Sequence, residues 1–110
     1  MGVDYSIATA FGWEIEDADV QKITGPYDKL GHDEPWEEAG EKINCPIRRV
    51  GNSYSGDFTY LVDLHRYDDG NGLAGYQKAA TRAEAVVAKA LEFGVKLEGE
   101  PQLLTRQNVY

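Results

Sequence analysis

The chain has 110 residues, of which 42% are hydrophobic, and it carries a formal net charge of −8. A chain of this size buries roughly two-thirds of its unfolded surface and needs no disulfide or metal to fold. No apolar run approaches the ~18 residues of a membrane-spanning helix, and the first residues carry acid where a secretory signal carries base. We therefore expect residues 1–110 to form one unprocessed cytoplasmic domain without membrane contact.

The negative charge lies in the first two-fifths of the sequence. Residues 1–45 hold eleven acids against three lysines, whereas residues 46–110 balance eight acids against eight bases. Such a field repels nucleic acid and anionic membranes and attracts basic partners. We therefore expect no direct nucleic-acid binding. The alternative interpretation is a solvated acidic face that only aids solubility.

The first predicted element is a strand over residues 3–15. Apolar side chains fall on its odd positions and several polar ones on its even positions, which is the period of two of a strand with one buried face. Its even side is small at Ala8, Ala10 and Gly12. This pattern predicts either close packing against that side or a bend in the strand.

Two short helices are predicted next. Residues 16–24 place acids in the first turn, which suits the helix dipole, and a Gly-Pro pair ends the pattern. Asp33 is predicted to cap a second helix, which uses Pro35 in its first turn and is weakened by Gly40.

The middle of the chain predicts a β-hairpin. Residues 47–50 and 58–66 have strand composition, and the octapeptide VGNSYSGD between them fits the opening of a phosphate-binding loop, G-x-x-x-x-G. That loop needs Lys and then Ser or Thr after its second glycine, but Asp57 and Phe58 stand there. We therefore interpret the octapeptide as a turn that exposes Tyr54 at the hairpin tip.

The last part of the chain predicts one clear helix. Residues 67–77 have the glycine density of a loop and lead into a helix at about 81–93, with Thr81 as its cap and Glu84 completing a capping box. A flexible or partner-dependent tail is expected from about residue 99. The predicted fold class is α+β: a mostly antiparallel sheet with this amphipathic helix packed on it and short helices in the first half.

Signals for catalysis or metal binding are weak. The DDGNG stretch departs from the calcium-loop pattern at two of its required positions, and His32, His65 and Cys45 are the only histidines and cysteine. No cofactor, metal site or catalytic residue is predicted. A small metal-dependent hydrolase using His65 and Asp68 stays open as an alternative.

The segment GHDEPWEEAGE suits a protein interface. Trp and Tyr are frequent interface anchors, and an acidic rim selects basic partners. The candidate partner-binding residues are Asp33, Glu34, Trp36, Glu37, Glu38, Glu41 and Tyr54. The alternative is that Trp36 folds inward and pins its own helix.

An arginine cluster provides a second candidate site. Arg48, Arg49 and Arg66 lie in the neutral half of the chain, and guanidinium groups suit phosphates. If these three side chains meet, they predict a small-molecule binder, such as a sponge for an anionic nucleotide signal.

The start MGVDYSIATAFGWEI and the later VGNSYSGD turn resemble small uncharacterised proteins encoded by bacteriophages and prophages. The resemblance covers only those two segments and brings no functional residues with it. It implies an accessory protein of the bacterial cytosol, where such proteins often inhibit host enzymes or defence systems. The leading hypothesis is therefore a binding protein that docks its acidic, aromatic-containing surface on a basic host protein and inhibits it, sterically or as a partial nucleic-acid mimic. The oligomeric state stays open, with a homodimer among the alternatives.

Overall fold

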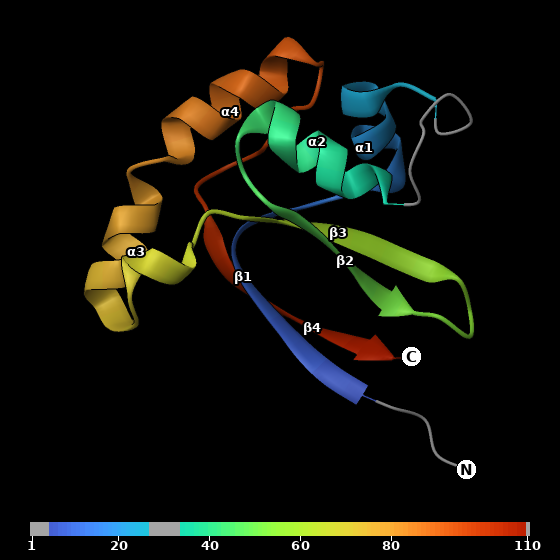
Figure 1. Cartoon of the computed structure of the whole chain (residues 1–110), viewed down its shortest axis with the longest axis horizontal. Helices are drawn as coiled ribbons and strands as arrows, with labels where there is room; N and C mark the ends of the chain where they lie inside the picture. The colour runs from blue at the N-terminus through green and yellow to red at the C-terminus, as the bar shows by residue number, and fades with distance from the viewer. Residues whose placement is uncertain (1–4, 27–33, 110) are drawn as a thin grey trace.

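Four strands form one sheet that closes on itself, and helices cover one side of it (Figure 1). The structure is a computed structural model that describes residues 5–26 and 34–109. The elements are, in chain order, β1 (Tyr5–Ile15), α1 (Asp17–Thr24), α2 (Pro35–Ile43), β2 (Ile47–Asn52), β3 (Asp57–Asp63), the 3-10 helix η2 (Tyr67–Asp69), α3 (Gly72–Ala80), α4 (Ala83–Glu92) and β4 (Gln102–Val109).

The sheet has the strand order β1-β3-β2-β4 and is mostly antiparallel. β1 pairs with β4 over residues 5–12 and with β3 over residues 12–15, while β2 and β3 form the predicted hairpin. A single parallel pair, Asn52 with Val109, closes the sheet. The predicted α+β class with a mostly antiparallel sheet is therefore confirmed.

The buried face of β1 changes at Gly12. Ile15 is 5% exposed, whereas Ile7, on the same parity of the strand, is 64% exposed. A Cβ on Gly12 would lie 1.9 Å from the carbonyl oxygen of Val62, so only glycine permits the close crossing at which β1 changes its pairing partner. The predicted single buried face over residues 3–15 is therefore wrong for the first half of the strand.

Two hydrophobic clusters lie on opposite sides of the sheet. The larger lies between the sheet and the helices and includes Trp13, Ile15, Val20, Ile43, Val62, Leu64, Val86, Ala90, Val95 and Leu97. The smaller lies inside the closed sheet and contains Ala10, Val50 and Leu61, with Ala8 and Leu104 packed against it. The small even-numbered side of β1 therefore faces the narrow interior, where only small side chains fit beside Leu61.

The two short helices of the first half form as predicted and pack against each other. The predicted cap Asp33 lies outside the described residues, and Glu34 is the N-cap of α2. Gly40 weakens the helix in isolation but is required by packing. A Cβ there would lie 2.9 Å from the carbonyl oxygen of Cys45, which is too close for an ordinary contact.

The second half departs from the sequence prediction in three places. Much of the predicted loop at 67–77 is helical, because it contains η2 and the start of α3. α4 agrees with the helix predicted at 81–93, but Thr81 does not cap it: its hydroxyl donates to the carbonyl oxygen of Lys78 at 2.6 Å. The tail expected from about residue 99 contains β4, which pairs with β1 over eight residues.

Candidate functional site

An acidic groove lies where the second half of β1 meets α1 and the loop before β4. Its volume is about 470 Å³. The charged residues that line this groove are Glu14, Glu16, Asp19, Glu98, Glu100, Lys96 and Arg106. Its buried lining residues are Gly12, Trp13, Ile15 and Leu97, so the surface that the groove exposes is mostly polar. Acids outnumber bases five to two in this lining, which therefore suits the charged end of a basic side chain.

The loop that completes the acidic groove is fixed to β1. The indole Nε1–H of Trp13 donates to the carbonyl oxygen of Gly99 at 3.1 Å, and Gly99 has the positive φ of 73° that the turn needs. Val95 and Leu97 are buried just before the turn. This anchoring brings Glu98 and Glu100 to the groove that the first strand and helix define.

One ion pair inside the groove neutralises part of its charge. Arg106 donates from Nε and Nη2 to the two carboxylate oxygens of Glu14 at 2.8 and 3.3 Å. Hydrogen bonding from Arg106 lowers the pKa of Glu14, and the same contact raises the pKa of Arg106. Glu14 therefore stays ionised but adds little net charge to the groove.

Of the remaining acids, Asp19 accepts a hydrogen bond from the backbone N–H of Glu16 at 3.0 Å and so takes part in the capping of α1. Asp19 lies 3.8 Å from the exposed Lys22, a separation at which an ion pair contributes little. Among the described residues, neither Glu98 nor Glu100 forms an ion pair. These two acids could not be recognised from the sequence because they belong to the half of the chain whose charges balance. Only the return of β4 alongside β1 brings them next to the acidic half.

The acids predicted on the second helix lie outside the acidic groove, and two of them, Glu37 and Glu41, line another groove with Arg48 and Arg66. Glu34, Glu37 and Glu41 are exposed and Glu38 is half-buried, whereas Asp33 lies outside the described residues. α1 and α2 lie side by side over the same part of the sheet (Figure 1). The acidic surface therefore comprises the groove and the exposed acids of these two neighbouring helices, of which Glu37 and Glu41 lie on the side of α2 that faces Arg48 and Arg66.

Trp36 points toward the core and contributes only part of its ring to the surface. It packs against the larger hydrophobic cluster, with its ring centroid 6.1 Å from that of Tyr60. The guanidinium of Arg49 lies over two rings, 4.6 Å from the centroid of Trp36 and 4.2 Å from that of Phe58. Trp36 thus pins α2 to the hairpin, as the alternative interpretation of the sequence held.

Tyr54 stands at the tip of the hairpin and is 70% exposed. The side-chain oxygen of Asn52 accepts hydrogen bonds from the backbone N–H groups of Tyr54 and Ser55, at 2.8 and 3.3 Å. This arrangement is a turn stabilised by an Asn side chain. The strand that follows it directly, β3, excludes a phosphate loop, which must open a helix.

The three arginines of the predicted anion site do not form one cluster. Arg48 contacts Asp63 and the carbonyl oxygen of Thr9, and it lines the same groove as Arg66. Arg49 lies on the opposite face of β2 because neighbouring strand residues alternate, and it is held between aromatic rings. The predicted set of three is therefore wrong, and only Arg48 and Arg66 share a site.

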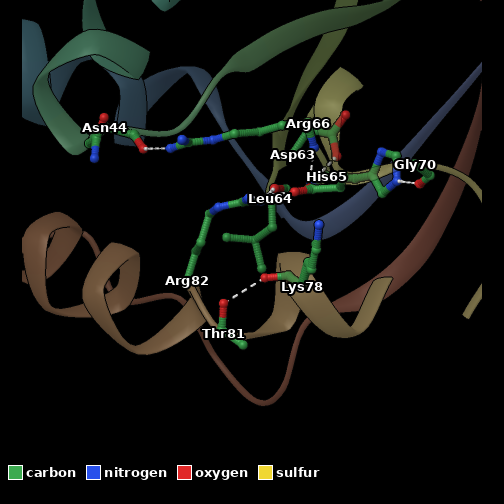
Figure 2. Close-up of polar contacts among 10 residues, drawn as sticks. Asn44, Asp63, Leu64, His65, Arg66, Gly70, Lys78, Thr81 and Arg82 are labelled. Carbon is green, nitrogen blue, oxygen red and sulfur yellow. Dashed lines mark hydrogen bonds and ion pairs between the residues drawn. The ribbon is translucent and has the colours of Figure 1, made fainter. Parts of the chain in front are cut away.

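A buried ion pair organises the segment after β3. Asp69 has a side chain that is 2% exposed, and it contacts Arg82 through both carboxylate oxygens. Arg82 also donates to the carbonyl oxygen of Leu64, a contact that Figure 2 shows from the side of α4. Hydrogen bonds from Arg82 lower the pKa of Asp69 well below its usual range. This pair ties η2 to α4 and has a structural role.

The residues of the hydrolase alternative are not arranged as a metal site. His65 Nε2 lies 2.8 Å from the carbonyl oxygen of Gly70, and its ring centroid lies 5.0 Å from that of Tyr76. Asp68 is exposed. Within residues 5–26 and 34–109, no three His, Cys, Asp or Glu side chains lie close enough to hold a metal ion. His32 lies outside those residues.

Cys45 is buried, and its thiol donates to the carbonyl oxygen of Asp63 at 3.1 Å. Burial raises the pKa of this thiol to about 12. The side chain is therefore a protonated thiol at neutral pH and has no nucleophilic character in the folded protein.

No family model, curated protein or solved structure matches the chain. Over the described part of the chain, no helix is both long enough and apolar enough to cross a membrane.

Proposed function

We propose that the protein is a binding protein that docks its acidic surface on a basic surface of another protein. The observation that carries the proposal is the acidic groove, in which Glu98 and Glu100 join Glu16 and Asp19. A lysine or arginine of the partner would place its charge among these carboxylates.

The neighbouring helices extend this surface. Exposed acids on α2, such as Glu34 and Glu41, give the partner a broad field that attracts basic groups and speeds association at low salt. Exposed charges of this kind are individually weak, each contributing about 0.2–1 kcal/mol. The groove therefore supplies the specific contact, and the helices supply the long-range attraction.

The resemblance of the N-terminal strand and the VGNSYSGD hairpin to phage and prophage proteins supports a further part of the proposal. On this basis the partner is a bacterial host protein in the cytoplasm, and docking inhibits it by covering a basic functional surface. A basic surface that normally contacts nucleic acid is the target that fits an acidic groove, so that the protein acts as a partial mimic of phosphate charge.

The test is affinity capture from a bacterial lysate with the immobilised full chain. We expect a basic protein to be retained at low salt and released by salt, because screening shortens the reach of charge interactions from about 30 Å at 0.01 M to about 3 Å at 1 M. A groove variant, Glu98→Lys with Glu100→Lys, should lose this partner.

The control variant makes the same change in net charge elsewhere. Asp57 and Glu84 are exposed and lie outside the acidic groove, so Asp57→Lys with Glu84→Lys tests net charge without touching the groove. A second variant, Glu34→Lys with Glu41→Lys, distinguishes the contribution of the α2 acids to capture from that of the groove acids. Equal loss of capture in the groove and control variants contradicts a specific site, and capture of no basic protein at low salt contradicts the proposed function.

A further inference from the structure

A second cavity has the opposite charge character from the rest of the chain. The basic pocket, as we call it, lies where the C-terminal end of α2 meets the start of α4 and the segment after β3, and its volume is about 470 Å³. Its residues are Ile43, Asn44, Arg66, Thr81, Arg82, Ala85, Val86 and Lys89. This lining has three cationic side chains and no acid, in a chain whose net charge is −8.

Only two of these three charges are available to a ligand. Arg82 is engaged by the buried Asp69 and serves as a fixed wall of the pocket. Lys89 lies 3.1 Å from Glu92, but both side chains are about half exposed or more. An exposed pair of this kind is weak, so Lys89 can turn to an anion at little cost.

Arg66 is the unusual residue of the basic pocket. Among the described residues its side chain makes one hydrogen bond, from Nη2 to the carbonyl oxygen of Asn44, and at 3.4 Å this bond is long. No carboxylate of the described residues pairs with it. Figure 2 shows the side chain extended toward Asn44, with Arg82 and Thr81 on the α4 side of it. A half-buried guanidinium with five donors and one long bond has unused capacity to bind an anion.

The surroundings indicate what kind of anion fits. Ile43, Ala85 and Val86 form an apolar part of the lining, and the amide of Asn44 adds polar groups beside Arg66. The volume lies in the range of small-molecule sites, about 300–1,000 Å³. The adjoining groove, which shares Asn44 and Arg66, also contains Glu37 and Glu41, so its acids disfavour an anion on that side.

We propose that the basic pocket binds a small phosphate monoester that carries an apolar group, such as a nucleoside monophosphate. Arg66 contacts the phosphate through two donors, Lys89 supplies a second positive charge, and the apolar group lies against Val86 and its neighbours. The basic pocket shares no lining residue with the acidic groove, so ligand binding in the pocket can be tested independently of the proposed protein docking.

The test is titration calorimetry of the full chain with adenosine 5′-monophosphate at low salt. Arg66→Gln should weaken binding about tenfold to a hundredfold, as expected for loss of a hydrogen-bonded charge, and Lys89→Met should weaken it several-fold. Arg49→Gln is the matched control, since it removes the same charge from outside the basic pocket and should leave the affinity unchanged.

Ligand controls separate the two halves of the site. Adenosine, which lacks the phosphate, should bind far more weakly than the monophosphate, and inorganic phosphate should also bind more weakly because it gains nothing from the apolar lining. Failure of the monophosphate to bind at millimolar concentration overturns the proposal, as does an Arg66→Gln affinity equal to that of the unaltered chain. Equal affinities for inorganic phosphate and the monophosphate overturn the assignment of the apolar half.

Discussion

The change of buried face in β1 at Gly12 makes a testable prediction, because it places two isoleucines in opposite environments although both occupy odd positions of the strand. Ile15 is 5% exposed and belongs to the larger hydrophobic cluster, whereas Ile7 is 64% exposed. Replacing isoleucine by alanine removes three carbon atoms, each of which contributes about 0.8 kcal/mol when buried. Ile15→Ala also leaves a cavity, so we expect it to lower the free energy of unfolding by about 2–5 kcal/mol.

Ile7→Ala is the matched comparison. Because about a third of the side chain is buried, the same scaling gives a loss of about 0.8 kcal/mol. Urea unfolding of the two variants measures both numbers, and an unchanged slope in each shows that only stability has changed. A straight strand with one buried face would make the two losses equal. Equal losses would therefore refute the change of buried face at Gly12 and the change of pairing partner that accompanies it.

Three further predictions concern single residues. Gly40→Ala should lower the free energy of unfolding by about 1 kcal/mol, because the clash of the new Cβ with the carbonyl oxygen of Cys45 outweighs the gain in helix propensity. The exposed substitution Ala88→Gly in α4 measures the helix-propensity difference between alanine and glycine without a clash. A Gly40→Ala chain that is more stable than the unaltered chain would contradict the close packing. Because the pKa of Glu14 is lowered in the folded protein, its pair with Arg106 stabilises the fold at pH values above the unfolded-state pKa, and this stabilisation is lost as the pH falls through the folded-state pKa. Glu14→Gln should therefore make the free energy of unfolding less dependent on acid pH. The effect should be at most about 1 kcal/mol because both side chains are partly exposed. Cys45 should react with a thiol reagent at pH 8 about a thousandfold more slowly in the folded protein than in urea, and comparable rates would show that the thiol is accessible.

The sequence predicted the elements whose signals are local. The hairpin of β2 and β3 follows from two alternating runs around a turn of Gly, Asn, Ser and Asp, and α4 follows from its apolar stripe. The start of α3 was predicted as loop because residues 67–77 contain Gly70, Gly72 and Gly75. Gly75 is nevertheless required by packing, since a Cβ at that position would lie 2.0 Å from the carbonyl oxygen of Gly70. Glycine density is thus ambiguous between a flexible loop and a close contact.

Long-range features could not be predicted in the same way. β4 has a mixed pattern of apolar and polar residues and becomes a strand by pairing with β1, which lies at the other end of the chain. That pairing also places Glu98 and Glu100 beside the acids of β1 and α1. The candidate acids on α2 could be predicted from local composition. The acidic groove could not, because it depends on tertiary contacts such as the hydrogen bond from the Trp13 indole to the carbonyl oxygen of Gly99.

The central claim is that the acidic groove, and not net charge alone, binds a basic partner. The most direct measurement is the dissociation constant of the captured partner for the unaltered chain, the Glu98→Lys/Glu100→Lys variant and the Asp57→Lys/Glu84→Lys control, each at several salt concentrations. We expect the groove variant to bind at least about tenfold more weakly than the control at low salt and to show a smaller salt dependence. Equal affinities and equal salt dependence for the two variants would contradict the claim.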